Sequence, residues 1–558
     1  MTRPVLKAML FCMAVLLQQS SFAQHLSGKE KIFTHADSLR GMLTPFRTCY
    51  DVTYYDLNVD IDMENKSISG YNKIYFDAVS DFEVMQVDLS SLLKIAYITD
   101  RGNNSLRFTR DGDAVFITMN TKINNGERNY ISIHYSGQPQ EGKMLPWDGG
   151  FKWTKDADDQ PWAAVACQGT GASVWWPCKE HQSDEPDSMA INITVPASLM
   201  DVSNGRLREV KNVDNGKKQY CWFVSYPINN YNVTVNVGVF THFSDVYVSG
   251  KDSLTLDYYV KPYNLEKAKK QFQQVKPMLA CYEKYFGRYP FWRDGYKLVE
   301  TPYVGMEHQS CIAYGNKYKN GYLGMDYSGI GVDFDYIIIH ETAHEWWGNN
   351  ITTKDIADMW VHEGFGSYAE VLYVECLYGK QKGNDYVNAQ KKKVANDRPI
   401  IGHYNVNEEG SGDMYPKGSL MLHTIRNYIN NDSLWFSIIL GLQQTFALQT
   451  VTTQQIEDYI SKQSGIDLSP VFNQYLRHSA IPVLEYEVKS TNPLTLRCRW
   501  KADVKDFNLP VWVGKGSSMQ SLKVTTSWQN FELKGVDEKT LDIRDDLGYF
   551  NITDLSNK

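Results

Sequence analysis

The sequence lacks both an excess of basic residues and a long apolar run beyond its first few residues. Lysine and arginine together number 57, against 65 aspartate and glutamate residues, so the formal net charge is −8. A nucleic-acid-binding protein usually carries a basic surface, and this balance argues against one. No segment after residue 17 approaches the roughly 20 consecutive apolar residues of a membrane-spanning helix. We therefore expect no nucleic-acid partner and no membrane span in the mature chain.

Cysteine is also sparse, with nine in 558 residues and no pair at C-x-x-C spacing. One of them, Cys12, lies in the N-terminal apolar run, and the other eight are scattered along the chain. This is unlike the dense frameworks that staple small secreted domains. We expect most of the eight to be buried thiols, with a disulfide between Cys167 and Cys178 kept open as an alternative.

The first 23 residues have the pattern of a secretory signal peptide. Arg3 and Lys7 precede an apolar run over residues 8–17, and a small-x-small sequence ends at Ala23. Such a run is too short to cross a membrane and is typical of an export signal. We expect cleavage after Ala23 and a periplasmic or secreted mature chain.

The hydrophobic pattern changes twice after the signal peptide. Apolar and polar residues alternate at many places in residues 24–248, as in 54–62 and 230–237, which is typical of antiparallel sheet. Helical spacing then dominates residues 249–478, and alternation returns in residues 479–558. We predict a multidomain α+β chain with an N-terminal antiparallel β domain, a mainly α central domain and a small C-terminal β-sandwich.

Within the central domain, two helices are expected with particular clarity. Residues 265–285 carry apolar side chains at helical spacing, and residues 454–464 follow Thr453, a residue type that caps helix N-termini.

The segment His340-Glu341-Thr342-Ala343-His344 carries the strongest chemical signal. Residues four apart on an α-helix differ by about 40° in direction, so His340 and His344 project from one face. Two imidazoles at this spacing suit zinc, and Glu341 beside them can serve as the base for a water molecule. The alternative is a surface helix whose two histidines are bonded elsewhere.

A third ligand follows nineteen positions after His344, at Glu363. Two histidines and one carboxylate, with a fourth position open to water, form a ligand set of hydrolytic zinc. We therefore predict one zinc ion per chain. Ligating histidines usually donate their second nitrogen to a carboxylate or carbonyl, and we expect Asp358 to take that part rather than Glu370.

Residues 340–349, H-E-T-A-H-E-W-W-G-N, and 360–370, W-V-H-E-G-F-G-S-Y-A-E, resemble the aminopeptidase-N family of zinc metallopeptidases, whose catalytic domain is thermolysin-like. Further segments extend the resemblance from about residue 50 to 480, and the chain is similar to a short, exported bacterial member. These are V-G-M-E-H at 304–308, similar to the family's G-x-M-E-N; Y-P-K-G at 415–418, similar to Y-x-K-G; and C-Q-G-T-G-A-S at 167–173 with W-P-C at 176–178 and D-E-P at 184–186.

The resemblance implies a zinc aminopeptidase that acts on peptides with a free N-terminus. Glu341 would be the general base and Tyr415 the donor to the developing oxyanion. Glu307, with Gln168 as a neutral acceptor beside it, would bind the substrate's α-ammonium. The backbone of Gly305 and Met306 would pair with the substrate as an added strand.

The sequence also departs from the family pattern. Val304 and His308 replace the first Gly and the Asn of G-x-M-E-N, and Gln168 stands where many members have Glu. Residues 179–183 look inserted. The chain ends at Lys558, without the large helical domain that closes the site in longer members, so we expect a more open site that accepts peptides of ordinary length.

Three other functions remain open from the sequence. The first is a secreted zinc endopeptidase with the same metal chemistry, against which Glu307 argues. The second is an epoxide hydrolase like the leukotriene-hydrolysing branch of the family. The third is a non-catalytic peptide-binding protein, which would tolerate loss of a ligand or base, whereas His340, Glu341 and Tyr415 are all retained.

Overall fold

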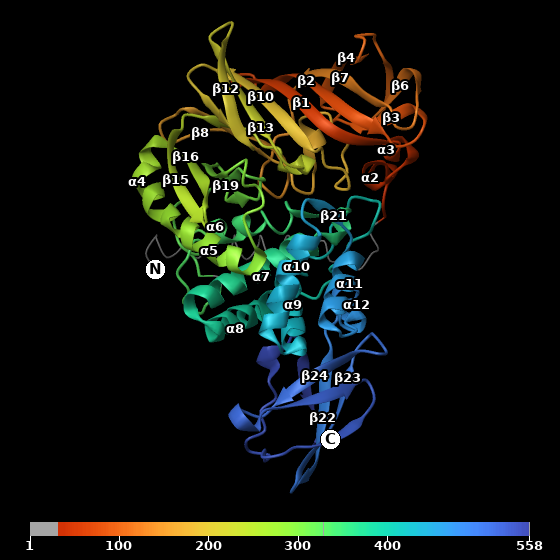
Figure 1. The fold of residues 1–558 in the computed structure, drawn as a ribbon, viewed down its shortest axis with the longest axis vertical. Helices are drawn as coiled ribbons and strands as arrows, with labels where there is room; N and C mark the ends of the chain where they lie inside the picture. Colours follow the sequence, from red (N-terminus) through yellow and green to blue (C-terminus); the bar gives the residue numbers. More distant parts are fainter. Residues whose placement is uncertain (1–31, 327, 557–558) are drawn as a thin grey trace, which may run out of the picture.

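The computed structural model describes residues 32–326 and 328–556. The predicted signal peptide and the expected start at Gln24 lie outside these residues. A β-rich region, a helical region and a small β region follow one another along the long axis of the molecule (Figure 1). The predicted fold class is confirmed.

The N-terminal domain is built on a seven-stranded sheet. The burial of β1 alternates along most of its length, because one face of the sheet packs on the core and the other is partly exposed. All neighbours in this sheet are antiparallel except β1 and β10, which run parallel. In spatial order the strands are β12 (Arg206–Val213), β13 (Lys217–Val224), β10 (Ser188–Pro196), β1 (Tyr50–Asp62), β2 (Ser67–Ala78), β7 (Arg128–Gly137) and β4 (Leu93–Asp100).

Two smaller sheets complete the N-terminal domain. One contains β3 (Phe82–Asp88), β6 (Ala114–Ile123) and β5 (Arg107–Asp111). The other contains β11 (Met200–Val202), β14 (Asn236–Gly238), β9 (Pro161–Ala166) and β8 (Gly150–Lys155).

The strand predicted at residues 230–237 is wrong for most of its length. Residues 230–232 form a 3-10 turn, and only the end of the segment joins β14. All eight residues are buried, so the alternation of asparagine with apolar residues does not mark a half-exposed strand. The asparagines instead bond inside the protein: Asn230 Nδ2 donates to the Lys179 carbonyl at 2.7 Å, and Asn236 Nδ2 to the Val202 carbonyl at 3.0 Å.

The central domain begins earlier than the predicted boundary at residue 248. The strand β15 (Thr241–Ser249) pairs with β16 (Asp252–Val260) in a five-stranded sheet, so the boundary falls before Thr241. The other strands of this sheet are β17 (Tyr296–Glu300), β19 (Ile312–Tyr314) and β18 (Gly305–Met306).

Helices form the rest of the central domain, together with the short pair β20 (Ile351–Thr353) and β21 (Gln449–Val451). Residues 360–374 of α7 are all buried, so this helix runs through the core. The cap of α11 is Thr452, which forms a capping box with Gln455, and not the predicted Thr453. The helices are α4 (Leu265–Gln271), α5 (Val275–Phe286), α6 (Tyr336–Ala343), α7 (Trp360–Tyr378), α8 (Lys380–Ala389), α9 (Pro416–Ile429), α10 (Asp432–Thr445), α11 (Thr453–Ser464) and α12 (Ser469–Arg477).

The C-terminal region contains two small sheets. The boundary predicted at 478/479 falls between the end of α12 and the start of β22. One sheet contains β26 (Gln529–Glu532), β23 (Leu494–Lys501), β22 (Val483–Thr491) and β27 (Asn551–Asp554), and the other β24 (Asn508–Val513) and β25 (Gln520–Thr525).

The eight cysteines in the described part of the chain are free, and all but Cys376 are buried. Cys167 and Cys178 are therefore thiols in this structure rather than a disulfide. Among the described residues, no helix combines the length and apolar character needed to cross a membrane.

Candidate metal centre and cleft

The first two predicted ligands lie at the end of α6. Asp335 caps the start of this helix, where its carboxylate accepts hydrogen bonds from the backbone N–H groups of Ile337 and Ile338. His340 lies in the last turn of α6, and His344 is the residue on which the helix ends. Their Nε2 atoms are 3.3 Å apart.

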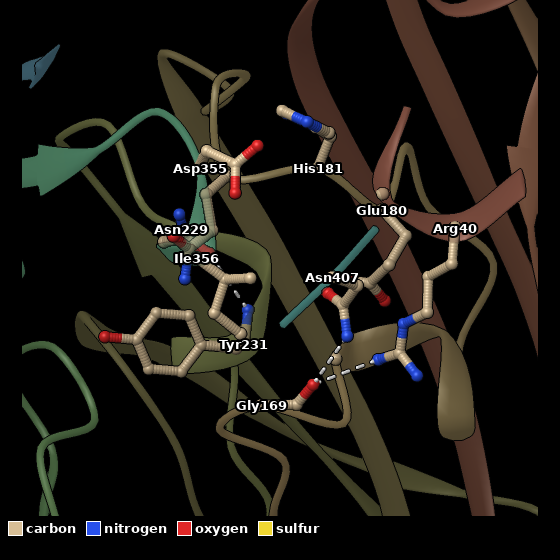
Figure 2. Close-up of a pocket in the computed structure, with 12 residues that line it drawn as sticks. Arg40, Gly169, Glu180, His181, Asn229, Tyr231, Asp355, Ile356 and Asn407 are labelled. Atoms are coloured by element: carbon tan, nitrogen blue, oxygen red, sulfur yellow. Dashed lines mark hydrogen bonds between the residues drawn. The ribbon is translucent and has the colours of Figure 1, made fainter. Parts of the chain in front are cut away.

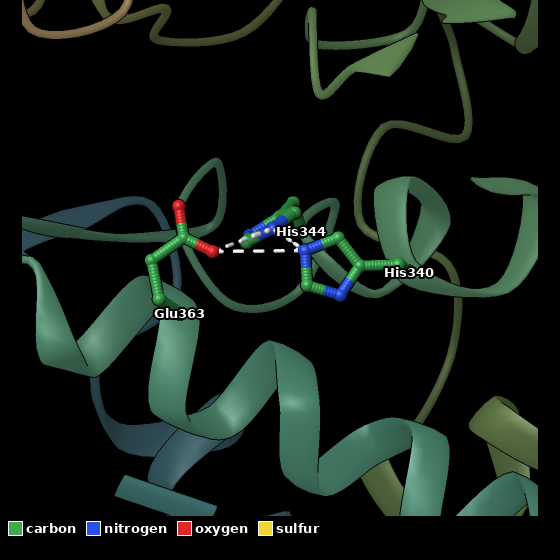
Figure 3. Close-up of side chains that lie close together, drawn as sticks. All are labelled: His340, His344 and Glu363. Atoms are coloured by element: carbon green, nitrogen blue, oxygen red, sulfur yellow. Dashed lines mark hydrogen bonds and ion pairs between the residues drawn. The ribbon is translucent and has the colours of Figure 1, made fainter. Parts of the chain in front are cut away.

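The third predicted ligand, Glu363, lies in the first turn of α7, which packs against α6. Its Oε2 atom is 3.6 Å from His340 Nε2 and 3.4 Å from His344 Nε2 (Figure 3). The structure therefore brings all three predicted ligands to one point, and all three are buried.

The donor set fits zinc. Ligands about 2.0–2.1 Å from a tetrahedral zinc ion lie roughly 3.3–3.4 Å from one another, close to the separations found here. Glu363 Oε2 is buried and has no hydrogen-bond partner among the described residues, so a cation would satisfy it. Burial acts to raise the pKa of Glu363, but the two histidines outweigh it and hold this pKa well below its ordinary value.

Each histidine is oriented through its second nitrogen. His340 Nδ1 lies 2.7 Å from Glu370 Oε1, and Glu370 Oε2 accepts a hydrogen bond from Tyr386 at 2.6 Å. His344 Nδ1 lies 2.9 Å from the Trp347 carbonyl. These contacts leave both Nε2 atoms free to face a metal ion.

The prediction that Asp358 orients a ligating histidine is wrong. Its carboxylate accepts hydrogen bonds from Tyr404 at 2.6 Å and from Thr453 Oγ1 at 2.5 Å, so it links the 3-10 turn before α7 to the start of α11. Glu370 orients His340 instead, because it lies seven residues after Glu363 on the same face of α7. That spacing is the signal that could have identified it.

A cleft of about 190 Å³ opens over the ligands. Apart from Asp358, all the site residues predicted from the sequence line it: Gln168, Gly305, Met306, Glu307, His340, Glu341, His344, Glu363 and Tyr415.

Glu341 is buried against the strand β18. A side chain at position 305 would come within 2.6 Å of Glu341 Oε1, so only glycine allows this approach. Burial raises the pKa of Glu341 to about 7, against the opposing charge of His340 and with the nearby Glu307 adding to the shift. A carboxyl group with a pKa near neutrality can both accept and return a proton.

Tyr415 directly precedes α9, and its ring is stacked 6.0 Å from that of His340. Burial, and then the charge of Glu363, raise the pKa of Tyr415 well above its ordinary value. The phenol therefore keeps its proton and remains a hydrogen-bond donor to the cleft.

Glu307 lines the same cleft and is buried. It accepts a hydrogen bond from Tyr231 of the N-terminal domain at 3.2 Å, and its backbone carbonyl accepts one from Asn349 at 2.9 Å. Burial is the main cause that raises its pKa. Tyr231 carries no motif among 36 tyrosines, so the sequence offered no means to single it out.

Two further features of the site have no local signal in the sequence. Gln168 Nε2 donates to Glu363 Oε1 at 2.9 Å, which links the N-terminal domain to a candidate metal ligand. Glu409 lies beside Gly169, where an added Cβ would be 3.1 Å from its Oε1 atom. Burial, with added repulsion from Glu363 and Glu307, raises the pKa of Glu409 to about 7.

Two family models match this chain and place it in a known family. The model of the peptidase M1 N-terminal domain matches residues 52–231, and that of the peptidase family M1 domain matches residues 270–475. Together with the site, these matches show that the chain belongs to peptidase family M1, the aminopeptidase-N family of zinc metallopeptidases.

Individual relatives are distant. A leucyl aminopeptidase of Saccharolobus solfataricus is 23% identical over 78% of this chain and 54% of its own length. Human endoplasmic reticulum aminopeptidase 1 is 24% identical over 56% of this chain and 34% of its own. The chain thus spans about half, or less, of the length of these relatives.

Solved structures share the fold. An M1 zinc metallopeptidase from Deinococcus radiodurans aligns with a TM-score of 0.66 at 20% identity, over 77% of this chain and 94% of that one. A mutant M1 zinc metallopeptidase from the same organism, bound to a Tyr-Ser-Ala substrate, aligns with a TM-score of 0.65 at 19% identity, over 77% and 95%.

Proposed function

We propose that this protein is a zinc aminopeptidase that removes N-terminal residues from peptides. The observation that supports this most is the position of Glu307, a buried carboxylate that faces the same cleft as the metal ligands. A carboxylate at a fixed place beside the metal is what recognition of a terminal ammonium requires. The names of the relatives agree with this activity.

One zinc ion per chain would be held by His340, His344 and Glu363. A zinc ion at this point supplies Lewis-acid chemistry, which makes water more acidic and polarises a peptide carbonyl.

The side chains around that point carry out proton transfer, stabilisation of the oxyanion and substrate binding. Glu341 accepts a proton from the attacking water and returns it to the leaving amine. Tyr415 donates a hydrogen bond to the carbonyl oxygen, where negative charge develops. Glu307 and the side-chain carbonyl of Gln168 hold the substrate's ammonium, while the backbone of β18 aligns the peptide.

The test is a panel of aminoacyl amides, each in free and N-acetylated form, assayed before and after treatment with a chelator. We expect turnover of the free amines alone, loss of turnover on chelation, and its return with zinc; metal analysis should give one zinc per chain. Cleavage of N-acetylated peptides at internal bonds would instead support an endopeptidase, and binding without turnover a peptide-binding protein.

We also propose that the protein is exported to the periplasm or the medium and matures at Gln24. The support is the basic, apolar and small-x-small pattern of residues 1–23. Mass spectrometry of the native protein should find Gln24 at its N-terminus. An intact Met1 would contradict this proposal.

A further inference from the structure

A segment ahead of both family-model matches packs beside the loop that carries Gln168. This N-terminal segment, residues 33–48, contains α2 (His35–Gly41) and α3 (Pro45–Thr48). Arg47 is fully buried and pairs with Asp88 of the N-terminal domain at 2.7 Å. The same guanidinium donates to the backbone carbonyl of Arg40 at 2.6 Å. The position of Arg40 is thereby fixed relative to the domain.

This segment contacts residues 167–173 of the N-terminal domain, called the active-site loop here because its Gln168 lines the cleft. Gly169 and Gly171 have φ angles of +71° and +84°, which other residues rarely adopt. At Gly171, an added Cβ would lie 2.5 Å from the Glu180 carboxyl carbon. This tight turn brings Gln168 to Glu363, to which its amide nitrogen donates.

The backbone carbonyl of Gly169 is held from two directions. Arg40 Nη2 donates to it at 3.3 Å and Asn407 Nδ2 at 3.2 Å, as Figure 2 shows. Arg40 comes from the N-terminal segment, whereas Asn407 comes from the central domain. Because this carbonyl belongs to the residue directly after Gln168, the two hydrogen bonds restrict where the Gln168 side chain can point.

The two donors belong to surfaces that pack closely. Gly41, at the end of α2, lies so near the backbone of residues 406 and 407 that an added Cβ would be 2.2 Å from the Asn407 nitrogen. The rings of Phe33 and His403 are 5.0 Å apart. The N-terminal segment therefore packs directly against the part of the central domain that carries Asn407.

We propose that Arg40 is a positioning residue of the metal centre and of the amine-binding site, acting through Gly169 and Gln168 on Glu363. The bond from Gln168 orients the Glu363 carboxylate, as outer contacts of metal ligands do. The same bond leaves the carbonyl oxygen of the Gln168 amide free to face the substrate's ammonium. This second role of Arg40 rests on the proposed function.

The first test measures zinc affinity by competition with a chromophoric chelator. Arg40→Ala and Gln168→Ala should each weaken zinc binding about 10-fold, the lower end of the range for outer contacts to a ligand. The double variant should bind zinc no more weakly than Gln168→Ala alone, because both changes remove the same effect. Zinc affinity of Arg40→Ala equal to wild type, or a double variant with the product of the two losses, would overturn the proposal.

Controls separate positioning from a general loss of stability. Arg293→Ala removes a comparable arginine-to-carbonyl bond, to Ser225 at 2.6 Å, away from the active-site loop, and should leave zinc affinity unchanged. Arg40→Lys keeps the charge and one donor and should recover part of the loss. If Arg40→Ala does not fold, Asn407→Ala removes the second bond to the same carbonyl and should weaken zinc binding in the same direction; no change there would overturn the proposal.

The second test measures kinetics on free-amine aminoacyl amides with zinc in excess. Arg40→Ala should raise KM about 10-fold with little change in kcat, since it affects binding of the ammonium more than the chemical step. An unchanged KM would overturn the substrate part. A wild-type protein that binds zinc but hydrolyses none of these amides would contradict the proposed function instead, while the zinc measurements would still decide the role of Arg40.

Discussion

Among individual residues, Glu341 has the clearest chemical task. Its buried carboxyl group has a pKa raised to about 7 by burial and lies beside both candidate histidine ligands. We predict that Glu341→Gln retains zinc but loses at least about 100-fold in kcat, because the amide cannot take up a proton. Metal analysis and turnover of the same preparation check this, and near-normal turnover in a zinc-loaded variant would contradict it.

Glu370 and Asp358 form a matched pair for testing the histidine's orientation. Both are buried acidic residues: Asp358 lies just before α7 and Glu370 lies within it. Only Glu370 contacts His340. We predict that Glu370→Ala weakens zinc binding about 10- to 100-fold, while Asp358→Ala leaves zinc affinity near wild type. Chelator competition compares the two variants, and equal losses in both would show that the contact to His340 has no special effect.

Burial of His308 should make the free energy of unfolding depend on pH. Its side chain is fully buried, neither ring nitrogen has a hydrogen-bond partner within the described ranges, and burial lowers its pKa to about 3. An unfolded histidine has a pKa of about 6.5, so between these values the unfolded chain binds a proton that the folded chain does not. Stability is therefore retained above about pH 6.5 and is lost as the pH falls through this window.

The comparison variant is His308→Asn, which has the residue of the family motif at this position. Between about pH 8 and pH 5, wild type should lose roughly 2 kcal/mol more unfolding free energy than the variant. Denaturant unfolding at both pH values measures the difference. Parallel pH dependence of the two proteins would contradict the assignment.

At the level of helices and strands, the sequence predicted what depends on local spacing. His340 and His344 lie four residues apart on one helix, so their shared direction follows from helix geometry alone. The fold class and the run of strands followed from hydrophobic periodicity in the same way. The start of the central domain could not be predicted from periodicity, because only the pairing with β16 shows that β15 belongs to the sheet of this domain.

Contacts between distant elements could not be predicted from one sequence. The choice between Glu370 and Asp358 depends on which face of α7 meets α6, and the bond from Gln168 to Glu363 joins residues 195 positions apart. Residues 230–237 were misassigned because their asparagines bond inside the core, although their alternation is that of a half-exposed strand. In each case the conformation or the contact is determined by tertiary packing and not by local propensity.

For the whole molecule, the essential feature is that two domains build one cleft. The central domain supplies the candidate metal ligands, Glu341 and Tyr415, while the N-terminal domain supplies Gln168 and the Tyr231 hydroxyl that donates a hydrogen bond to Glu307. The proposed exopeptidase activity requires a fixed distance between an anionic anchor and the metal, and the contacts between the two domains would hold Glu307 at such a distance.

The most direct test of that construction is the ratio of kcat/KM between a free-amine substrate and its N-acetylated counterpart, measured on zinc-loaded wild type and Glu307→Ala. A charge-assisted hydrogen bond contributes about 1.5–3 kcal/mol, and each ~1.4 kcal/mol is one decade. We predict a high ratio in wild type, and in the variant a fall of at least about 10-fold in kcat/KM for the free amine with unchanged zinc content. An equal ratio in the two proteins, or efficient cleavage of N-acetylated peptides by wild type, would contradict the assignment of Glu307 as the amine anchor.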